Sequence, residues 1–402
     1  MLVVDHTLTV PLDHDDPAGP SIEVFARGIA AHDGGDRPYL VYLQGGPGFE
    51  APRPSRWPSS PAWLGRALRD YRVLMLDQRG TGRSTPYGAP GEDPAADAER
   101  LRHYRADSIV RDAECFREHL GVERWSVLGQ SFGGFCSLHY LSAAPESLRA
   151  AYVTGGLPPV GRTADDVYST TFNTMRRLNE RYLRRFPEDR DRLTRLLDRC
   201  DAGEVRTPDG VPVSRRLMRT VGAPLGMDGG AESIHHLLEL DPDSQAFRYD
   251  LAAMLPFKAR NPLYAVVHEA CYADGGVTAW AAERMLPAVF DDDHDLFTGE
   301  HVYPWMFEDY GELAPLREAA ELVAAQEWPP LYDPAVLAAN EVPCAAAIYT
   351  EDMYVEREFS EETAAQVAGI RTWVTSEFDH NGLRADGARV LGHLIDLVRG
   401  RA

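Results

Sequence analysis

The sequence predicts an α/β fold with a mostly parallel sheet, helices on both faces of that sheet, and a helical segment inserted late in the chain. Over the first 160 residues, short β-branched or aromatic segments alternate with helical patterns, as in repeated βαβ units. Between about Pro158 and Val342 the strand patterns fade, and Arg- and Leu-rich helical patterns replace them. A strand pattern returns at Cys344, so the sheet is expected to be completed after the insertion.

The expected elements follow in the order that such a fold requires. Strands are predicted at Ser21–Arg27, Tyr39–Leu43, Arg72–Leu76, Trp125–Leu128 and Ala150–Val153, with helices at Ile109–Leu120 and Phe132–Ala143. The insertion is expected to hold helices at Phe172–Phe186, Arg190–Arg199 and Ala279–Met285. The last elements are a strand at Cys344–Tyr349, a helix at Ser360–Val367, a strand at Arg371–Thr375 and a helix at Ala388–Arg399. We therefore divide the chain into a core (1–158), a helical cap domain (159–342) and the rest of the core (343–402).

Composition excludes several classes of protein. The 402 residues include 41 basic and 62 acidic side chains, a net charge of −21 that disfavours nucleic acid as a partner. The single lysine, Lys258, follows phenylalanine, which excludes a Walker phosphate loop. Five cysteines without a Cys-x-x-Cys pair indicate reduced thiols in the cytoplasm. We expect no signal peptide and no membrane span, because no long apolar run occurs.

The most informative motif is Gly129-Gln130-Ser131-Phe132-Gly133, between a predicted strand and a predicted helix. In this context Gly-x-Ser-x-Gly forms a tight turn that lifts the serine hydroxyl above the sheet. The serine would also lie at a helix N-terminus, whose free N–H groups favour an oxyanion. The motif predicts Ser131 as a nucleophile and the Phe132 N–H as an oxyanion donor.

A second glycine-rich loop, Gln44-Gly45-Gly46-Pro47-Gly48, directly follows the strand Tyr39–Leu43. Consecutive glycines allow backbone N–H groups to turn outward, as a second oxyanion donor must. We predict Gly46, in preference to Gly45, as that donor.

A serine nucleophile needs a histidine base, and the base needs a carboxylate that holds its tautomer. Asp352 follows the strand Cys344–Tyr349, and His380 lies between the last strand and the last helix. Both would emerge at the carboxyl edge of the sheet, beside Ser131. Glu351 and Asp379 remain alternatives for the carboxylate.

These motifs, together with Asp77-Gln78-Arg79-Gly80-x-Gly82-x-Ser84, resemble the proline iminopeptidases of the α/β-hydrolase family. The segment Gly129–Cys136 and parts of the cap resemble the longer bacterial prolyl aminopeptidases. The chain departs from the pattern at Gln44, where many relatives have histidine, so the support of the oxyanion loop differs. The resemblance implies that Asp77 and Arg79 brace loops around the site. Cys136 lies five residues after Ser131 on the predicted helix, and we expect it to be a packed side chain.

The same resemblance implies that glutamates of the cap hold the substrate's free amine, and Glu269 and Glu300 match those positions. His268-Glu269 lacks the second histidine of a zincin, and the acidic run 291–295 lacks the glycine of a calcium loop. We therefore expect no metal and no cofactor.

The predicted function is a serine aminopeptidase that releases N-terminal proline from short peptides through an acyl-enzyme. The alternatives are a tripeptidyl aminopeptidase, a small-molecule esterase, or an inactive hydrolase that serves as a binding protein. Ser131 argues against epoxide hydrolases and dehalogenases, which need an aspartate at that position.

Overall fold

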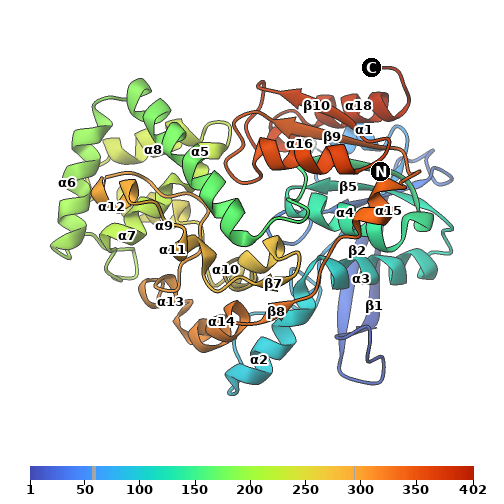
Figure 1. Ribbon diagram of the computed structural model, residues 1–402, viewed down its shortest axis with the longest axis horizontal. Coiled ribbons are helices and arrows are strands. Elements are labelled where there is room, and N and C mark those ends of the chain that lie inside the picture. The colour runs from blue at the N-terminus through green and yellow to red at the C-terminus, as the bar shows by residue number, and fades with distance from the viewer. Residues whose placement is uncertain (57–59, 294) are drawn as a thin grey trace.

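The computed structural model describes residues 1–56, 60–293 and 295–402, which fold around an eight-stranded sheet (Figure 1). The strand order is β1-β2-β4-β3-β5-β6-β9-β10. The strands are β1 (Leu2–Pro11), β2 (Ser21–Ala30), β3 (Tyr39–Leu43), β4 (Arg72–Leu76), β5 (Trp125–Gln130), β6 (Leu148–Thr154), β9 (Cys344–Tyr349) and β10 (Arg371–Thr375). The β1–β2 and β2–β4 pairs are antiparallel and the other neighbours in this sheet are parallel, which confirms the predicted α/β fold.

Helices cover both faces of the sheet (Figure 1). The helices outside the insertion are α1 (Leu64–Ala67), α2 (Pro94–Leu101), α3 (Ala106–His119), α4 (Phe132–Ala143), α16 (Arg357–Gln366), α17 (Gly382–Ala385) and α18 (Gly387–Val398). Side chains alternate along β3, so that Val41 and Leu43 pack in the core formed with α3 and α4. Leu40 and Tyr42 pack in the opposite core, formed with α1 and α18. Both faces of the sheet are thus buried, as expected where parallel strands predominate.

Between β6 and β9 the chain is mainly helical and lies to one side of the sheet (Figure 1). This part contains α5 (Ala164–Arg185), α6 (Asp189–Asp201), α7 (Arg215–Arg219), α8 (Gly230–Glu239), α9 (Gln245–Met254), α10 (Pro262–Val266), α11 (Ala281–Arg284), α12 (Val289–Asp292), α13 (Met306–Asp309), α14 (Arg317–Ala324), α15 (Pro334–Ala338) and the short strands β7 (Gly276–Val277) and β8 (Glu327–Trp328). The long helix α5 begins with a capping box, in which Thr163 and Asp166 each accept a hydrogen bond from the other's backbone N–H.

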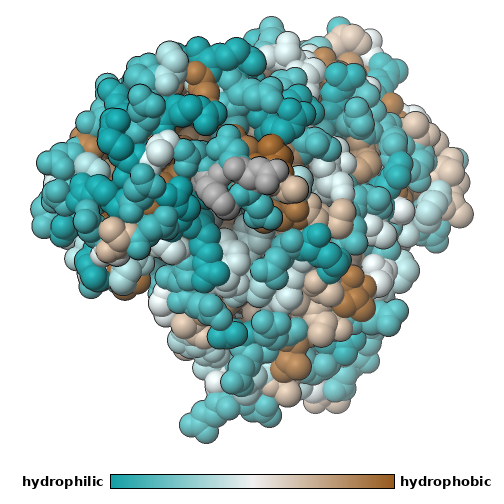
Figure 2. All heavy atoms as spheres, turned by 60° about the vertical axis from the view of Figure 1, so that its left-hand side comes forward, coloured by the Kyte–Doolittle hydropathy of each residue, from teal (hydrophilic) through white to brown (hydrophobic). Residues whose placement is uncertain are grey.

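The surface of the insertion is largely hydrophilic, and apolar side chains occur there only in small groups (Figure 2). Arginine and acidic side chains pair across its helices. Arg215, for example, contacts Asp198, Asp201 and Asp295. In the described parts of the chain, no helix is both long and apolar enough to span a bilayer.

The strand β1 was not predicted, because the sequence interpretation assigned no element to Leu2–Pro11. This segment pairs along its whole length with β2 and forms the edge of the sheet. Its first residues are exposed, so its apolar side chains do not mark a buried strand.

Arg79 lies at the centre of a buried network that ties the start of the chain to the core. Its guanidinium donates two hydrogen bonds to the Asp112 carboxylate, at 2.7 and 2.6 Å, and others to the carbonyls of Pro11, Leu12 and His103. Arg79 and Asp112 are each about 1% exposed. Asp77 of the same turn accepts from Arg53 and from the Arg83 N–H. The Asp77–Ser84 turn therefore braces several segments of the core.

We predict that Arg79→Met lowers the free energy of unfolding by about 3–5 kcal/mol, because it leaves the Asp112 carboxylate buried without its main partner. Urea unfolding of the variant and the wild type measures the difference. The double variant Arg79→Met/Asp112→Leu is expected to regain part of the loss. A single variant within about 1 kcal/mol of the wild type would show that the network contributes little.

Candidate active site

Ser131 lies at a sharp turn between β5 and α4, in a strained backbone conformation. Its φ of 55° and ψ of −122° are unusual for a residue with a side chain, and such strain is concentrated at functional sites. The Ser131 N–H donates to the Thr154 carbonyl at 2.8 Å, which anchors the turn to the end of β6. The hydroxyl-bearing residue is thus fixed at the carboxyl edge of the sheet.

Glycine is required on both sides of this turn. A Cβ at Gly129 would lie 2.1 Å from the Gly133 carbonyl oxygen, and a Cβ at Gly133 would lie 1.9 Å from the Leu43 carbonyl oxygen. Contacts this short cannot be relieved without moving α4 away from β5 or β3. The close approach explains why both glycines of the motif flank Ser131.

The oxyanion loop lies directly against this turn. A Cβ on Gly45 would be 3.1 Å from the Ser131 Cβ, and Gly46 has a φ of 131°, which favours glycine. Phe132 is the first residue of α4, so its N–H has no partner within the helix. The structure thus places the two predicted donors, Gly46 and Phe132, in segments that meet at Ser131.

Gln44 supports this loop through both its backbone and its side chain. Its carbonyl accepts from the Gln78 side chain at 2.8 Å, and its side-chain oxygen accepts from the Tyr42 hydroxyl at 2.5 Å. Gln78 belongs to the turn after β4, so two neighbouring strands hold the loop. These contacts hold the loop in place with glutamine at position 44, where many relatives have histidine.

His380 and Asp352 form a buried pair at the ends of neighbouring strands. The distance from His380 Nδ1 to Asp352 Oδ2 is 2.6 Å, and the other Asp352 oxygen accepts from the N–H groups of Tyr354 and Val355. Since a carboxylate only accepts, Nδ1 carries the proton and Nε2 is left with a lone pair. The Tyr354 ring packs on the imidazole at 4.6 Å, a contact that the sequence interpretation missed.

Gly155 brings this pair next to Ser131. A Cβ built on Gly155 would lie 3.1 Å from His380 Cε1 and 3.2 Å from the Ser131 N atom. The imidazole edge and the strained turn therefore flank the same glycine. The structure places Ser131, His380 and Asp352 close together at the carboxyl edge of the sheet.

Neither of the two alternative carboxylates makes the hydrogen bond to His380 Nδ1. Asp379 pairs with Arg181 of α5 at 3.6 Å, and the hydrogen bond on His380 Nδ1 is made by Asp352 and not by Glu351. The geometry thus favours Asp352 as the partner of His380.

Glu300 lies near the His380–Asp352 pair, because the charge of Asp352 acts on its carboxyl. Burial, and next the negative charge of Asp352, raise the pKa of the Glu300 carboxyl well above its usual range. The nearest ionisable partner is His268, whose Nε2 is 3.9 Å from Glu300 Oε2, and the Glu300 side chain retains 15% exposure. A Cβ built on Gly299 would lie 2.9 Å from the Met353 Cε, so the segment that carries Glu300 runs next to the loop that carries Asp352.

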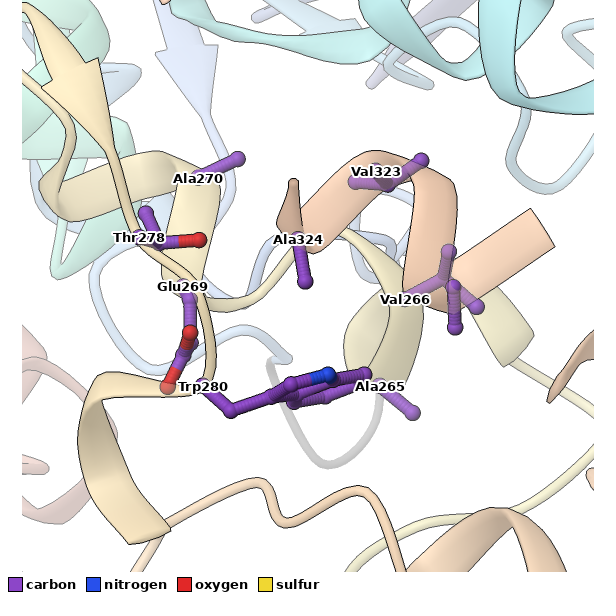
Figure 3. Close-up of a pocket in the computed structure, with 9 residues that line it drawn as sticks. Ala265, Val266, Glu269, Ala270, Thr278, Trp280, Val323 and Ala324 are labelled. Atoms are coloured by element: carbon purple, nitrogen blue, oxygen red, sulfur yellow. The ribbon is translucent and has the colours of Figure 1, made fainter. Parts of the chain in front are cut away.

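Glu269 makes different contacts. Its two oxygens accept from the N–H groups of Ala281 and Ala282 at the start of α11, at 3.2 and 2.9 Å. Figure 3 shows its carboxylate next to Trp280 at one side of a small pocket between α10, α11 and α14. Burial raises the pKa of Glu269 to about 7. The structure therefore leaves Glu300, more than Glu269, free to receive a ligand.

Both glutamates nevertheless border the same tyrosine. Burial, and then the charges of Glu269 and Glu300 among others, raise the pKa of Tyr168. The Tyr168 hydroxyl is buried and has no hydrogen-bond partner among the described residues. Tyr272 packs against Tyr168 of the insertion and against Phe135 of α4, the helix that follows Ser131.

The other features that the sequence singled out carry no site. Cys136 is a fully buried thiol, and the five cysteines are free. The acidic run 291–295 includes position 294, which lies outside the described residues.

Among the described side chains, Glu188, Asp189 and His235 are close enough to hold a metal ion. Asp189 already accepts from Tyr182, Arg192 and His235, so we propose no metal there.

The chain is similar to known proteins in sequence and in fold. The family model of the alpha/beta hydrolase fold matches residues 38–199. Over 98% of this chain and 96% of the relative, the sequence is 47% identical to the proline iminopeptidase of Aeromonas sobria. It is 34% identical to the proline iminopeptidase aneH of Aspergillus aculeatus, over 98% of this chain and 92% of that protein. A solved proline iminopeptidase of Mycobacterium smegmatis is 16% identical, with a TM-score of 0.48 over 99% of this chain and 100% of that one.

Proposed function

Since the chain belongs to the proline iminopeptidase family of α/β-hydrolases, we propose that it is a serine aminopeptidase that releases N-terminal proline from short peptides. The single observation that carries this proposal is the buried His380–Asp352 pair beside the strained Ser131 turn. We also infer a cytoplasmic location, which the five free thiols support.

In the proposed reaction, Ser131 Oγ attacks the carbonyl carbon of the N-terminal residue while His380 Nε2 takes the hydroxyl proton. Asp352 holds the imidazole in this tautomer and stabilises the cation that forms. The N–H groups of Gly46 and Phe132 bind the oxyanion. His380 then gives its proton to the leaving peptide amine. In the second half of the reaction, His380 takes a proton from a water molecule, which attacks the acyl-enzyme, and then returns the proton to Ser131 Oγ as proline leaves.

Recognition of the free amine is assigned to the insertion, which we propose acts as a cap domain over residues 159–342. Glu300 is the direct partner of the substrate ammonium, because its carboxylate is desolvated and, within the described part of the chain, has no closer ion-pair partner than His268 at 3.9 Å. Glu269 supports this contact by holding the start of α11 and by adding negative charge near Tyr168. Both glutamates therefore contribute to substrate binding, but through different contacts.

This function is tested with a panel of p-nitroanilides of proline, alanine and leucine and of a tripeptide. We expect the highest kcat/KM for the prolyl amide, and covalent labelling of Ser131 by a fluorophosphonate. If the tripeptide amide were cleaved faster at its third residue, the chain would be a tripeptidyl aminopeptidase. If only esters were cleaved, it would be an esterase.

The raised pKa of Glu300 gives a second prediction, on pH dependence. Below this pKa the carboxyl is neutral and does not pair with an ammonium, so binding of the amine should weaken as pH falls. The ratio of kcat/KM for prolyl p-nitroanilide to that for p-nitrophenyl acetate should therefore rise with pH, until the substrate amine loses its own proton near about pH 8. Taking the ratio cancels the protonation of His380, which both substrates require.

The control is Glu300→Gln, which has no titratable carboxyl. In this variant the ratio should be low and should not rise over the acidic and neutral range. A wild-type ratio that does not change with pH across the acidic and neutral range would contradict the assignment of Glu300.

A further inference from the structure

His268 is a buried histidine, and neither of its ring nitrogens makes a hydrogen bond of normal length within the described part of the chain, although the Glu300 backbone carbonyl lies near the ring. It lies between α10 and the 3₁₀ turn Glu269–Tyr272. The rings of Phe257, Tyr264 and Tyr272 pack edge-on against it, with centroids 5.4 to 6.2 Å away. Buried polar side chains are nearly always hydrogen-bonded, so an unpaired imidazole in an aromatic enclosure points to a partner that binds there.

The only charged group close to this ring, among the described residues, is the Glu300 carboxylate, 3.9 Å from Nε2. That distance is too long for a hydrogen bond. It is close to the separation of two acceptors that bind the same tetrahedral nitrogen at about 2.8 Å, which is roughly 4.5 Å. A small movement of either side chain would let a single N–H₂⁺ group bridge the two.

The ring is in the right protonation state to accept. Burial lowers the pKa of His268 to about 4, so at neutral pH the ring is uncharged and one nitrogen offers a lone pair.

We propose that His268 Nε2 is a second acceptor for the substrate amine and so helps to determine specificity for N-terminal proline, an inference that rests on the proposed function. The ammonium of an N-terminal proline has two N–H groups. One would donate to Glu300 and the other to His268 Nε2. Both donors are then satisfied within the buried site.

A primary ammonium has three N–H groups, and beyond Glu300 and His268 the third would have to use a hydroxyl such as that of Tyr168, which is a weaker acceptor than a carboxylate or an imidazole. The oxygens of Glu269 already accept from Ala281 and Ala282. One N–H of an alanyl or leucyl substrate would therefore be left with a weaker acceptor, which costs free energy in a desolvated site. The count of acceptors thus favours secondary over primary amines, in addition to any fit of the proline ring.

Two variants test the role of the imidazole. His268→Phe keeps an aromatic ring against Phe257, Tyr264 and Tyr272 but removes both nitrogens. His268→Gln keeps an acceptor oxygen on a flexible side chain. We expect His268→Phe to lower kcat/KM for prolyl p-nitroanilide roughly 10- to 100-fold, mainly through KM, and His268→Gln to lose clearly less. Acylation by p-nitrophenyl acetate, which has no amine, should stay within about threefold of the wild type in both variants.

The preference for secondary amines is measured on the wild type with N-methylalanyl and alanyl p-nitroanilides, which differ by one N-methyl group. We expect the N-methylated substrate to have the higher kcat/KM, by about tenfold. Equal rates on these two substrates, a His268→Phe variant that cleaves the prolyl amide like the wild type, or equal losses on amide and ester would each overturn the inference. A wild-type protein that cleaves no aminoacyl amide would instead refute the proposed function.

Discussion

Replacing Ser131 with alanine is expected to lower kcat for prolyl p-nitroanilide by about 10⁴-fold or more. Alanine removes the nucleophile, and only substrate binding and the oxyanion donors then contribute to the rate. The substitution adds no atom to the turn, where the backbone already has a φ of 55°. The fold should therefore be unchanged, which circular dichroism and thermal unfolding of the variant will show.

Covalent labelling by a fluorophosphonate tests the role of Ser131 independently of turnover. A fluorophosphonate should modify the wild type once, on Ser131, and should leave the variant unmodified. A variant that keeps a tenth of the wild-type activity would show that Ser131 is not the nucleophile.

The second large effect is expected for Glu300→Gln. Removing the charged partner of a desolvated ammonium costs on the order of 3–5 kcal/mol, or roughly 10²- to 10³-fold in kcat/KM for the prolyl amide. Acylation by p-nitrophenyl acetate should stay near the wild-type rate, because the groups that act on it, Ser131 and His380, are unchanged. Steady-state kinetics on both substrates measure the difference.

Glu269→Gln is the matched comparison. Glutamine keeps one acceptor oxygen but places an NH₂ group against the N–H groups of Ala281 and Ala282. We expect a lower unfolding temperature and a smaller loss of kcat/KM than in Glu300→Gln. A larger kinetic loss for Glu269→Gln, without a change in stability, would assign the amine contact to Glu269 instead.

Much of the core could be predicted from the sequence because its local patterns agree with its tertiary structure. The strands β3, β4, β9 and β10 and the helix α4 have the predicted bounds. The strand β1 was missed because it is an exposed edge strand. The alternation Thr7-Leu8-Thr9-Val10 was a signal that could have identified it.

The sites differ in how far sequence could specify them. Ser131, Asp352 and His380 follow the ends of strands, so their order in the chain already brings them to one edge of the sheet. The contacts of Glu269 and Glu300 depend on how short helices of the insertion pack. The spacing of residues in the sequence does not show that the Glu269 carboxylate accepts hydrogen bonds from N–H groups at the start of α11. Nor does it show that His268 lies next to Glu300 while its ring nitrogens have no hydrogen-bond partner among the described residues.

The most direct test of a serine aminopeptidase compares prolyl p-nitroanilide with its N-acetyl derivative on the wild-type protein. Acetylation removes the positive charge that Glu300 is proposed to bind and adds bulk beside it, while the scissile bond is the same. We predict that the acetylated substrate loses at least about 10²-fold in kcat/KM. Equal rates on the two substrates would contradict recognition of a free N-terminal amine and would show an endopeptidase or amidase instead.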